Sequence, residues 1–265
     1  MIRLEFPPAI AGTRLARVPG QWLTELRLWQ PGGHAAYTTA EVESAAVLLH
    51  GTFDLVGNDT AWPARGARRT EYEGRPMAVF LPPRAEFAAS GPVGEIAIVA
   101  ARQPAKVEEP AGRAALSHKP LLPMAGSGKA FDPGTGEWRP AETFPTAAES
   151  LPPRRMQQFR IGAMTVERVL APDYKAATLS IDELVLPAGT DLTLGTIPER
   201  PPATEVLLLL RTEGQLSLAD ATTGTVHHHP PEAEHAWLLS AAEFAALRLR
   251  AEVGRGYALI AYAGK

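Results

Sequence analysis

The sequence predicts an all-β fold built from two similar halves. The pentapeptide Ala-Glu-Phe-Ala-Ala occurs at residues 85–89 and again at residues 242–246, each time after an apolar, strand-like run. Strand-like segments surround both copies in the same order, with glycine turns at matching places. Segments that recur in a fixed order at similar offsets indicate an internal duplication. Short, evenly spaced strands in two such sets are typical of two antiparallel β-barrels or jelly rolls.

The segments of the two halves can be paired in chain order. In the first half, about residues 20–102, period-two alternation over residues 22–29 predicts a strand with one buried face, and a Pro-Gly-Gly turn ends it. In the second half, about residues 160–263, the counterpart is a strand over residues 177–186 that ends at Pro-Ala-Gly. Three further pairs of strands follow, namely 47–55 with 209–218, 78–81 with 237–239, and 95–100 with 257–262.

This arrangement predicts which side chains form the core, and it places Phe87 and Phe244 at equivalent positions. We expect the buried residues to be Leu26, Leu28, Val47, Leu49, Phe53, Phe80 and Phe87 in the first half, and Leu179, Ile181, Leu208, Leu210, Leu216, Leu238, Phe244 and Ile260 in the second. No long segment has convincing helical periodicity, although the pattern leaves short helices near residues 40–44 and 241–245 open.

Proline and glycine divide the chain into three parts. Between residues 103 and 153 they recur so often that a long helix or a central strand is excluded, because proline fixes φ and removes a backbone donor. The sequence therefore predicts an N-terminal barrel over residues 1–102, a proline-rich linker over 103–159 that packs on the barrels, and a C-terminal barrel over 160–265.

The overall composition narrows the function classes. A net charge of −3 and a pI near 6.2 argue against a general nucleic-acid-binding protein, which needs a basic surface. The chain contains no cysteine, so disulfides and thiolate metal sites are excluded. No apolar run approaches the length of a membrane span and no signal peptide is evident, so we expect a cytoplasmic protein without a membrane partner. The sequence leaves the formation of a homo-oligomer open.

Two segments of the first half resemble a known family. They are Val-Leu-Leu-His-Gly-Thr-Phe at residues 47–53 and the strand, Pro-Pro and turn pattern at residues 79–87. With the proline-rich connection and the duplicated plan, they resemble the 5-deoxy-glucuronate isomerases of inositol catabolism, which are related to the uronate ketol-isomerases of pectin breakdown. The resemblance implies a duplicated cupin, or bicupin, and the interconversion of an aldose and a ketose form of a sugar acid.

The resemblance also implies a divalent metal, Zn, Mn or Fe, in the second barrel. The family holds it with a His-x-His pair, a downstream glutamate and a late histidine. Here the residues that follow Pro-Ala-Gly, 191–198, contain no histidine, and none occurs around residues 242–244. Glu205 matches the glutamate. We therefore expect no metal of the family type, and we expect Glu205 to reach solvent or to pair with Arg211 or Arg248.

Other histidines offer weaker metal candidates. In the first half, His34, Glu41, Glu43 and His50 span the range of a cupin motif, but their spacing is wrong, and a strand histidine is the better interpretation of His50. In the second half, His227 and His229 would point the same way on a strand, and His235 could approach them. Three imidazoles suit Zn²⁺ or Ni²⁺, whereas the surrounding proline and glutamate favour an exposed loop.

Two hypotheses about function remain open from the sequence. In the first, the chain is a sugar-acid isomerase in which Glu205 and Arg211 supply the base and the electrophile that the proton transfer needs. In the second, it is a non-catalytic bicupin that binds a small carbohydrate or organic acid, or that has a structural role. No cofactor is expected unless the family chemistry survives.

Overall fold

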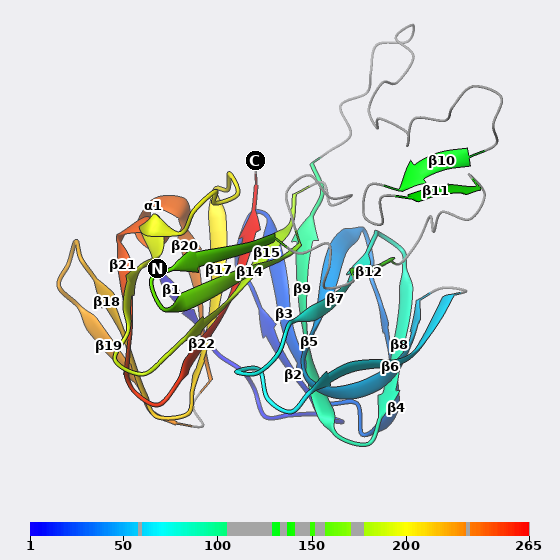
Figure 1. The fold of residues 1–265 in the computed structure, drawn as a ribbon, viewed down its shortest axis with the longest axis horizontal. Helices are drawn as coiled ribbons and strands as arrows, with labels where there is room; N and C mark the ends of the chain where they lie inside the picture. The colour runs from blue at the N-terminus through cyan, green and yellow to red at the C-terminus, as the bar shows by residue number, and fades with distance from the viewer. Residues whose placement is uncertain are drawn as a thin grey trace, which may run out of the picture.

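The computed structural model describes residues 1–57, 60–104, 129–132, 137–140, 149–151, 157–170, 178–231 and 234–264. They form two β-barrels that lie side by side, each made of curled antiparallel sheets (Figure 1). The predicted all-β, duplicated fold is therefore confirmed. In this part of the chain, no helix is long and apolar enough to cross a membrane.

The first barrel is built around one long strand, β5 (Val42–Gly57), which belongs to both of the sheet layers that form the barrel. The first part of β5 pairs with β7 and β9, and the second part pairs with β6 and β8. The strand turns at Gly51, where φ is 97° and an added Cβ would lie 2.5 Å from the carbonyl oxygen of Val93, so glycine is required. The strands are β2 (Thr13–Arg17), β3 (Leu23–Trp29), β4 (Gly33–Thr38), β5 (Val42–Gly57), β6 (Thr60–Arg68), β7 (Met77–Leu81), β8 (Glu86–Gly91) and β9 (Gly94–Arg102).

The second barrel uses two strands, β17 and β18, where the first uses β5, and a turn at Gly214 separates them. Its sheet also takes in β1 (Ile2–Leu4), which crosses from the N-terminus to pair with β20. The other elements are β13 (Gln157–Ile161), β14 (Met164–Leu170), β15 (Ser180–Leu186), β16 (Asp191–Thr193), η3 (Leu194–Thr196), β17 (Glu205–Thr212), β18 (Gln215–Asp220), β19 (Val226–His229), β20 (His235–Ser240), α1 (Ala241–Ala246), β21 (Leu247–Val253) and β22 (Gly256–Ala263).

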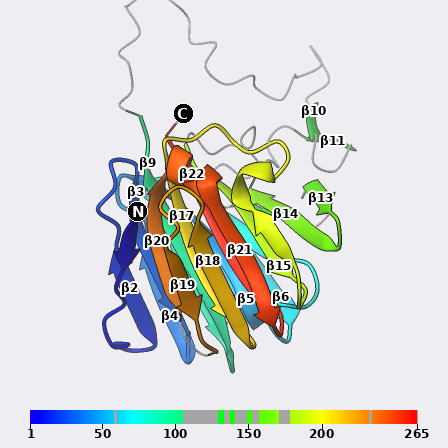
Figure 2. The same cartoon turned by 90° about the vertical axis from the view of Figure 1, so that its left-hand side faces the viewer.

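The order of the strands is the same in both barrels. The central sheet of the first runs β12-β7-β5-β9-β3-β2, where β12 is Glu149–Leu151. That of the second runs β1-β20-β17-β22-β15-β14-β13. The outer layers match as well, because β4, β8, β5 and β6 of the first correspond in pairing order to β16, β21, β18 and β19 of the second. Figure 2 shows β21, β18 and β19 side by side on the face toward the viewer. The segments paired from the sequence, such as 95–100 with 257–262, lie on equivalent strands.

The repeated pentapeptide, in contrast, does not mark equivalent positions, and that prediction was wrong. Its first copy lies on β8, where Phe87 faces Tyr37 of β4, whereas the second copy forms helix α1. The reason is local, because Ser240 and Glu243 form a capping box in which each side chain accepts a hydrogen bond from the backbone N–H of the other. Helix α1 is thus an insertion between β20 and β21 that the first barrel lacks.

Apolar side chains form one core inside each barrel and a third, larger one between them. The third core lies where the two central sheets pack face to face, and strands from both halves contribute to it. Every side chain that the sequence predicted as buried is at most 7% exposed, which confirms the predicted core.

The boundaries of the three predicted parts stay predictions. Most of the proline-rich linker lies outside the described residues. Within it, β10 (Lys129–Asp132) and β11 (Glu137–Pro140) form a hairpin, and β12 (Glu149–Leu151) pairs with β7 at the edge of the first central sheet. A strand at a sheet edge agrees with the expectation that this segment cannot hold a central strand.

The two phenylalanines should each contribute strongly to stability, although they lie in different elements. Phe87 and Phe244 are both 1% exposed and contact Trp29 and Tyr262 edge to face. Replacing either by alanine should lower the free energy of unfolding by about 3–5 kcal/mol. Urea denaturation would measure this, with Val93→Ala at an exposed position as control. An unchanged midpoint in both variants would contradict the described packing.

Candidate binding site in the second barrel

The alternation of side chains along β17 separates the two predicted catalytic residues from the barrel interior. Val206, Leu208 and Leu210 point into the second barrel, whereas Leu207 and Leu209 point into the core between the sheets. Glu205 and Arg211 share the second face, at opposite ends of the strand, and therefore lie roughly 20 Å apart. The structure does not bring them together.

The carboxylate of Glu205 holds a loop of the other half. It accepts hydrogen bonds from the backbone N–H groups of Gln21, Trp22 and Leu23 at 2.6, 2.9 and 3.0 Å. Gly20 is required beside it, because an added Cβ would lie 2.4 Å from a carboxylate oxygen. Glu205 therefore pairs with backbone donors, so the expected pairing with Arg211 or Arg248 was wrong, whereas its half-buried side chain partly reaches solvent, as the other alternative predicted.

Glu43 repeats this arrangement from the first half. It lies near the start of β5, the strand equivalent to β17, and its Oε1 accepts from the backbone N–H groups of Thr178 and Leu179, each at 2.7 Å. The registers match, because Glu43 faces Ala101 of β9 just as Glu205 faces Ala263 of β22. Glu43 and Glu205, the two junction carboxylates, are thus related by the duplication, and each fixes the chain that enters β15 or β3.

Arg211 belongs to a network of charges between the halves. Its guanidinium donates to Glu95 at 2.6 Å and also contacts Glu71 and Glu234, while Arg14 bridges Glu95 and Glu234. Burial alone would lower the pKa of Arg211, but the carboxylates hold its pKa above the usual value. Arg211 is therefore a fixed cation whose hydrogen bonds go to glutamates of the junction.

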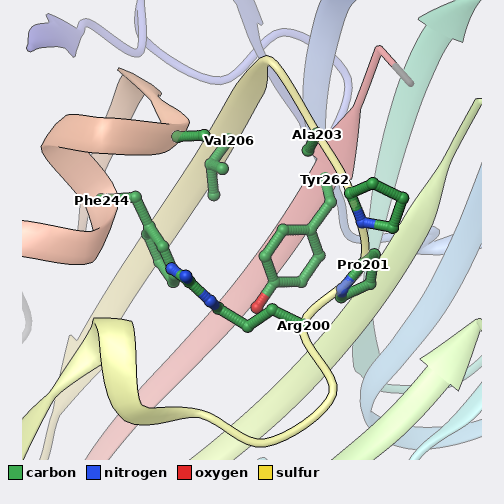
Figure 3. A pocket seen from close by; sticks show the side chains of 8 residues that line it. Arg200, Pro201, Ala203, Val206, Phe244 and Tyr262 are labelled. Carbon is green, nitrogen blue, oxygen red and sulfur yellow. The ribbon is translucent and has the colours of Figure 1, made fainter.

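A pocket of about 240 Å³ opens at the end of the second barrel, near α1 (Figure 3). Its lining residues are six apolar ones and two with polar side chains, Arg200 and Tyr262. The side chain of Arg200 extends across the pocket, and the ring of Tyr262 points into it with its hydroxyl toward Arg200 (Figure 3). The apolar residues of the wall are Pro201, Pro202, Ala203, Val206, Ala241 and Phe244.

The two polar groups of the pocket differ in how far they are engaged by the protein. Tyr262 is 2% exposed, and its hydroxyl lies against the Asp182 carboxylate. Burial and the nearby Asp182 carboxylate hold the pKa of Tyr262 well above its usual range, so the phenol keeps its proton. Arg200 is exposed and has no ion pair within the described part of the chain. The pocket thus offers a ligand one cation, Arg200, beside a buried phenol that faces Asp182.

Comparisons with known proteins agree with this architecture. The model of the KduI/IolB family matches residues 20–119. This confirms the resemblance that the sequence indicated. Among curated proteins, none matches the chain.

Solved structures extend the likeness in fold to the whole chain. An IolB-like protein from Salmonella typhimurium aligns with 100% of this chain and 93% of its own, at 14% identity and a TM-score of 0.68. AerE from Microcystis aeruginosa aligns over 99% and 97% at 9% identity and a TM-score of 0.54. Quercetin 2,3-dioxygenase from Acinetobacter baumannii aligns over 98% and 83% at 10% identity and a TM-score of 0.54. At such identities these likenesses show a shared bicupin fold.

The side chains at the KduI/IolB metal positions do not fit a metal. Where the resemblance places the His-x-His pair, Leu192, Leu194 and Ile197 fill the barrel interior instead. Glu205 faces away from the barrel, and Phe244 occupies the region of the late histidine. Within the described residues, no group of three or more His, Asp or Glu side chains is arranged to hold an ion. Of these side chains, Phe244 also lines the pocket.

The weaker histidine candidates are likewise not arranged as a metal site. Glu41 pairs with Arg84 at 2.8 Å, and His50 lies 3.9 Å from Glu95. Neither shares a site with Glu43, and His34 is exposed. In the second barrel, the rings of His229 and His235 meet edge to face at 4.3 Å, and His227 stacks near Trp237. His229 and His235 are buried, contrary to the exposed loop that the sequence favoured.

The sequence analysis missed Arg200 and Tyr262. Tyr262 lies in a strand that was predicted correctly, but strand alternation alone does not show that a pocket ends at its hydroxyl. Arg200 follows residues 191–198, where the resemblance implies histidines. Because arginine is not a metal ligand, the implied motif gave no signal for it. A charged residue in a proline-rich loop, Glu-Arg-Pro-Pro at 199–202, was the available signal.

Removing the charge of Glu205 should weaken the junction between the halves. In Glu205→Gln the amide keeps one acceptor oxygen but turns an NH₂ group toward backbone donors, so the free energy of unfolding should fall by about 1–3 kcal/mol. Urea denaturation would measure it, and Glu199→Gln on an exposed loop is the matched control. If both variants are as stable as the wild type, the three hydrogen bonds contribute nothing.

The buried histidines should make the fold sensitive to acid. Burial first, and then the neighbouring His235, His227, Arg3 and His228, lower the pKa of His229 from 6.5 to about 3, and no acidic group offsets them. Between those values the unfolded chain binds the proton and the folded chain does not, so the free energy of unfolding should fall as the pH drops below about 6.5.

Urea denaturation at pH 7 and at pH 4.5 would measure this dependence. His229→Leu should show a shallower loss of stability than the wild type, because the leucine does not titrate. His228→Leu, on the exposed face of the same strand, should behave as the wild type does. Equal losses in His229→Leu and the wild type would contradict the assignment.

Proposed function

We propose that the chain is a bicupin that binds a small carboxylic acid, either a sugar acid or another organic acid, in the pocket of its second barrel. The observation that carries this proposal is Arg200, a cation without an ion pair among the described residues, whose side chain extends across the pocket (Figure 3). A guanidinium binds a carboxylate through two parallel hydrogen bonds. The family match over residues 20–119 supports a ligand of the sugar-acid type.

The pocket favours binding over the isomerisation carried out by the family. Moving a proton between adjacent carbons requires a base within hydrogen-bonding reach of the substrate. No carboxylate or imidazole is among the residues that line the pocket, and Tyr262 keeps its proton. Asp182 lies behind Tyr262 and is bound by Arg168 at 2.9 Å, so its charge is already engaged. We therefore propose a non-catalytic role for the second barrel.

The second candidate function is the isomerisation of 5-deoxy-glucuronate, which the family match favours. It would need a divalent metal that this set of side chains does not hold as it stands. Glu205 and Arg211 remain its candidate catalytic residues. Because Glu205 also stabilises the junction, loss of turnover in Glu205→Gln counts as catalytic only if the variant is folded.

Two measurements separate these functions. Isothermal titration of untagged protein with a panel of carboxylates, including glucuronate, should detect binding that Arg200→Gln weakens at least about tenfold. Arg250→Gln, an exposed arginine on β21, is the matched control and should bind normally. Elemental analysis after dialysis should find less than stoichiometric metal. One equivalent of Zn, Mn or Fe together with turnover of 5-deoxy-glucuronate would overturn the proposal in favour of the isomerase.

We also propose that the protein is cytoplasmic and has no membrane partner. Its slightly negative net charge supports the further proposal that it has no nucleic-acid partner. Whether copies associate into a homo-oligomer is left open by the proposal. Size-exclusion chromatography with light scattering would establish it.

A further inference from the structure

The second barrel is closed along one side by side chains alone. Strand β19 pairs with β18, and β20 pairs with β17 and β1, so no strand pairing joins β19 to β20 in the described part of the chain. Four aromatic side chains span this junction, which we name the histidine seam. They are His227 and His229 of β19 and His235 and Trp237 of β20, and each lies opposite a leucine that belongs to the barrel core.

The rings of the seam contact one another without hydrogen bonds. His229 meets His235 edge to face with ring centroids 4.3 Å apart, and the ring of His227 lies 4.7 Å from that of Trp237. Among the described residues, neither ring nitrogen of His229 or His235 has a hydrogen-bond partner, although all four are buried. Closing the seam therefore takes these nitrogens out of water without compensation.

The charges that face the seam are positive. Arg3 of β1 lies opposite Trp237 in the strand register, and its guanidinium is 6.0 Å from the centre of that ring. The inward side chains of β17 and β21 are apolar, and Asp220 at the end of β18 is held by the turn that follows it. Glu234 is bound by two arginines, and Glu5 is exposed past the end of β1.

A proton on either buried histidine would oppose the closed seam. Burying an imidazolium is unfavourable, and Arg3 would repel it. Burial and the positive neighbours accordingly lower the pKa of both His229 and His235. Opening the seam would let water reach the rings and restore their ordinary pKa. Because no strand pairing crosses the seam, β19 can move away from β20 while its ladder with β18 stays intact.

We propose that the histidine seam is a proton-operated closure of the second barrel, in which neutral His229 and His235 keep β19 against β20 and their protonation separates the two strands. The opening is local, because the first barrel and the core between the central sheets contain none of the seam side chains. It is independent of the proposed function, since His235 lies opposite Leu210 whereas Val206, at the other end of β17, lines the pocket.

A cysteine inside the barrel would report the opening, because the chain has no cysteine of its own. Leu218, opposite His227, is 0% exposed. Leu218→Cys should react with dithiodipyridine at least about tenfold faster at pH 5 than at pH 7, because each histidine shifts the opening by up to about tenfold per pH unit. Rates are divided by those of the exposed Val253→Cys, which removes the effect of pH on the thiol itself.

Two comparisons separate this opening from unfolding. Leu55→Cys, on the equivalent strand of the first barrel, should stay protected at both pH values. In the Leu218→Cys background, His229→Leu should reduce the acceleration at least about threefold, whereas His228→Leu, on the exposed face, should leave it unchanged. No acceleration at pH 5, equal acceleration in Leu55→Cys, or no effect of His229→Leu would each overturn the inference.

Fluorescence tests the same opening in a chain without a substituted leucine. Trp237 is 4% exposed, so acrylamide should quench it poorly at pH 7 and more strongly at pH 5. Trp237→Phe keeps an aromatic ring in the seam and should lack the increase in quenching. An increase that persists in Trp237→Phe, or its absence in the wild type, would overturn the inference.

Discussion

The packing of two central sheets face to face constrains the rest of the molecule. Each of their strands has one face in a barrel and the other in the shared core. Each side chain therefore packs either inside its barrel or against the other half. The junction carboxylates Glu43 and Glu205 stand on the shared face at the ends of β5 and β17. There they satisfy backbone donors of the opposite half, which would otherwise be left unpaired at a buried edge.

This constraint explains why the one apparent match to the metal-binding residues of the family has a different role. A residue at the start of β17 can reach the barrel only if its side chain points to the even face, where Val206 lies, and Glu205 is on the odd face. Leucine side chains fill the interior of the barrel. Burying charged, metal-ligating side chains there would therefore be energetically unfavourable. The pocket beside α1 opens at one end of this barrel.

The sequence allowed the strand order and the cores to be predicted, because period-two alternation and glycine turns are local signals. It failed at the pentapeptide, where a capping box formed by Ser240 and Glu243 turns the same five residues into a helix. It also failed for Glu205, whose partners lie more than a hundred residues away in the other half, and for Arg211, which pairs with Glu95 and Glu71 of that half as well as with Glu234. Only the register between β17 and its neighbours reveals which face such a residue occupies, and the sequence does not determine that register by itself.

The division between faces also separates binding from stability. Apart from Tyr262 and Val206, the residues of the pocket come from the loop before β17 and from α1, elements that take no part in the shared core. Tyr262 and Val206 point to the barrel side of their strands. Substitutions can therefore alter the pocket without disturbing the junction carboxylates or the charges around Arg211. The barrel can in this way keep its fold while the residues around its pocket vary.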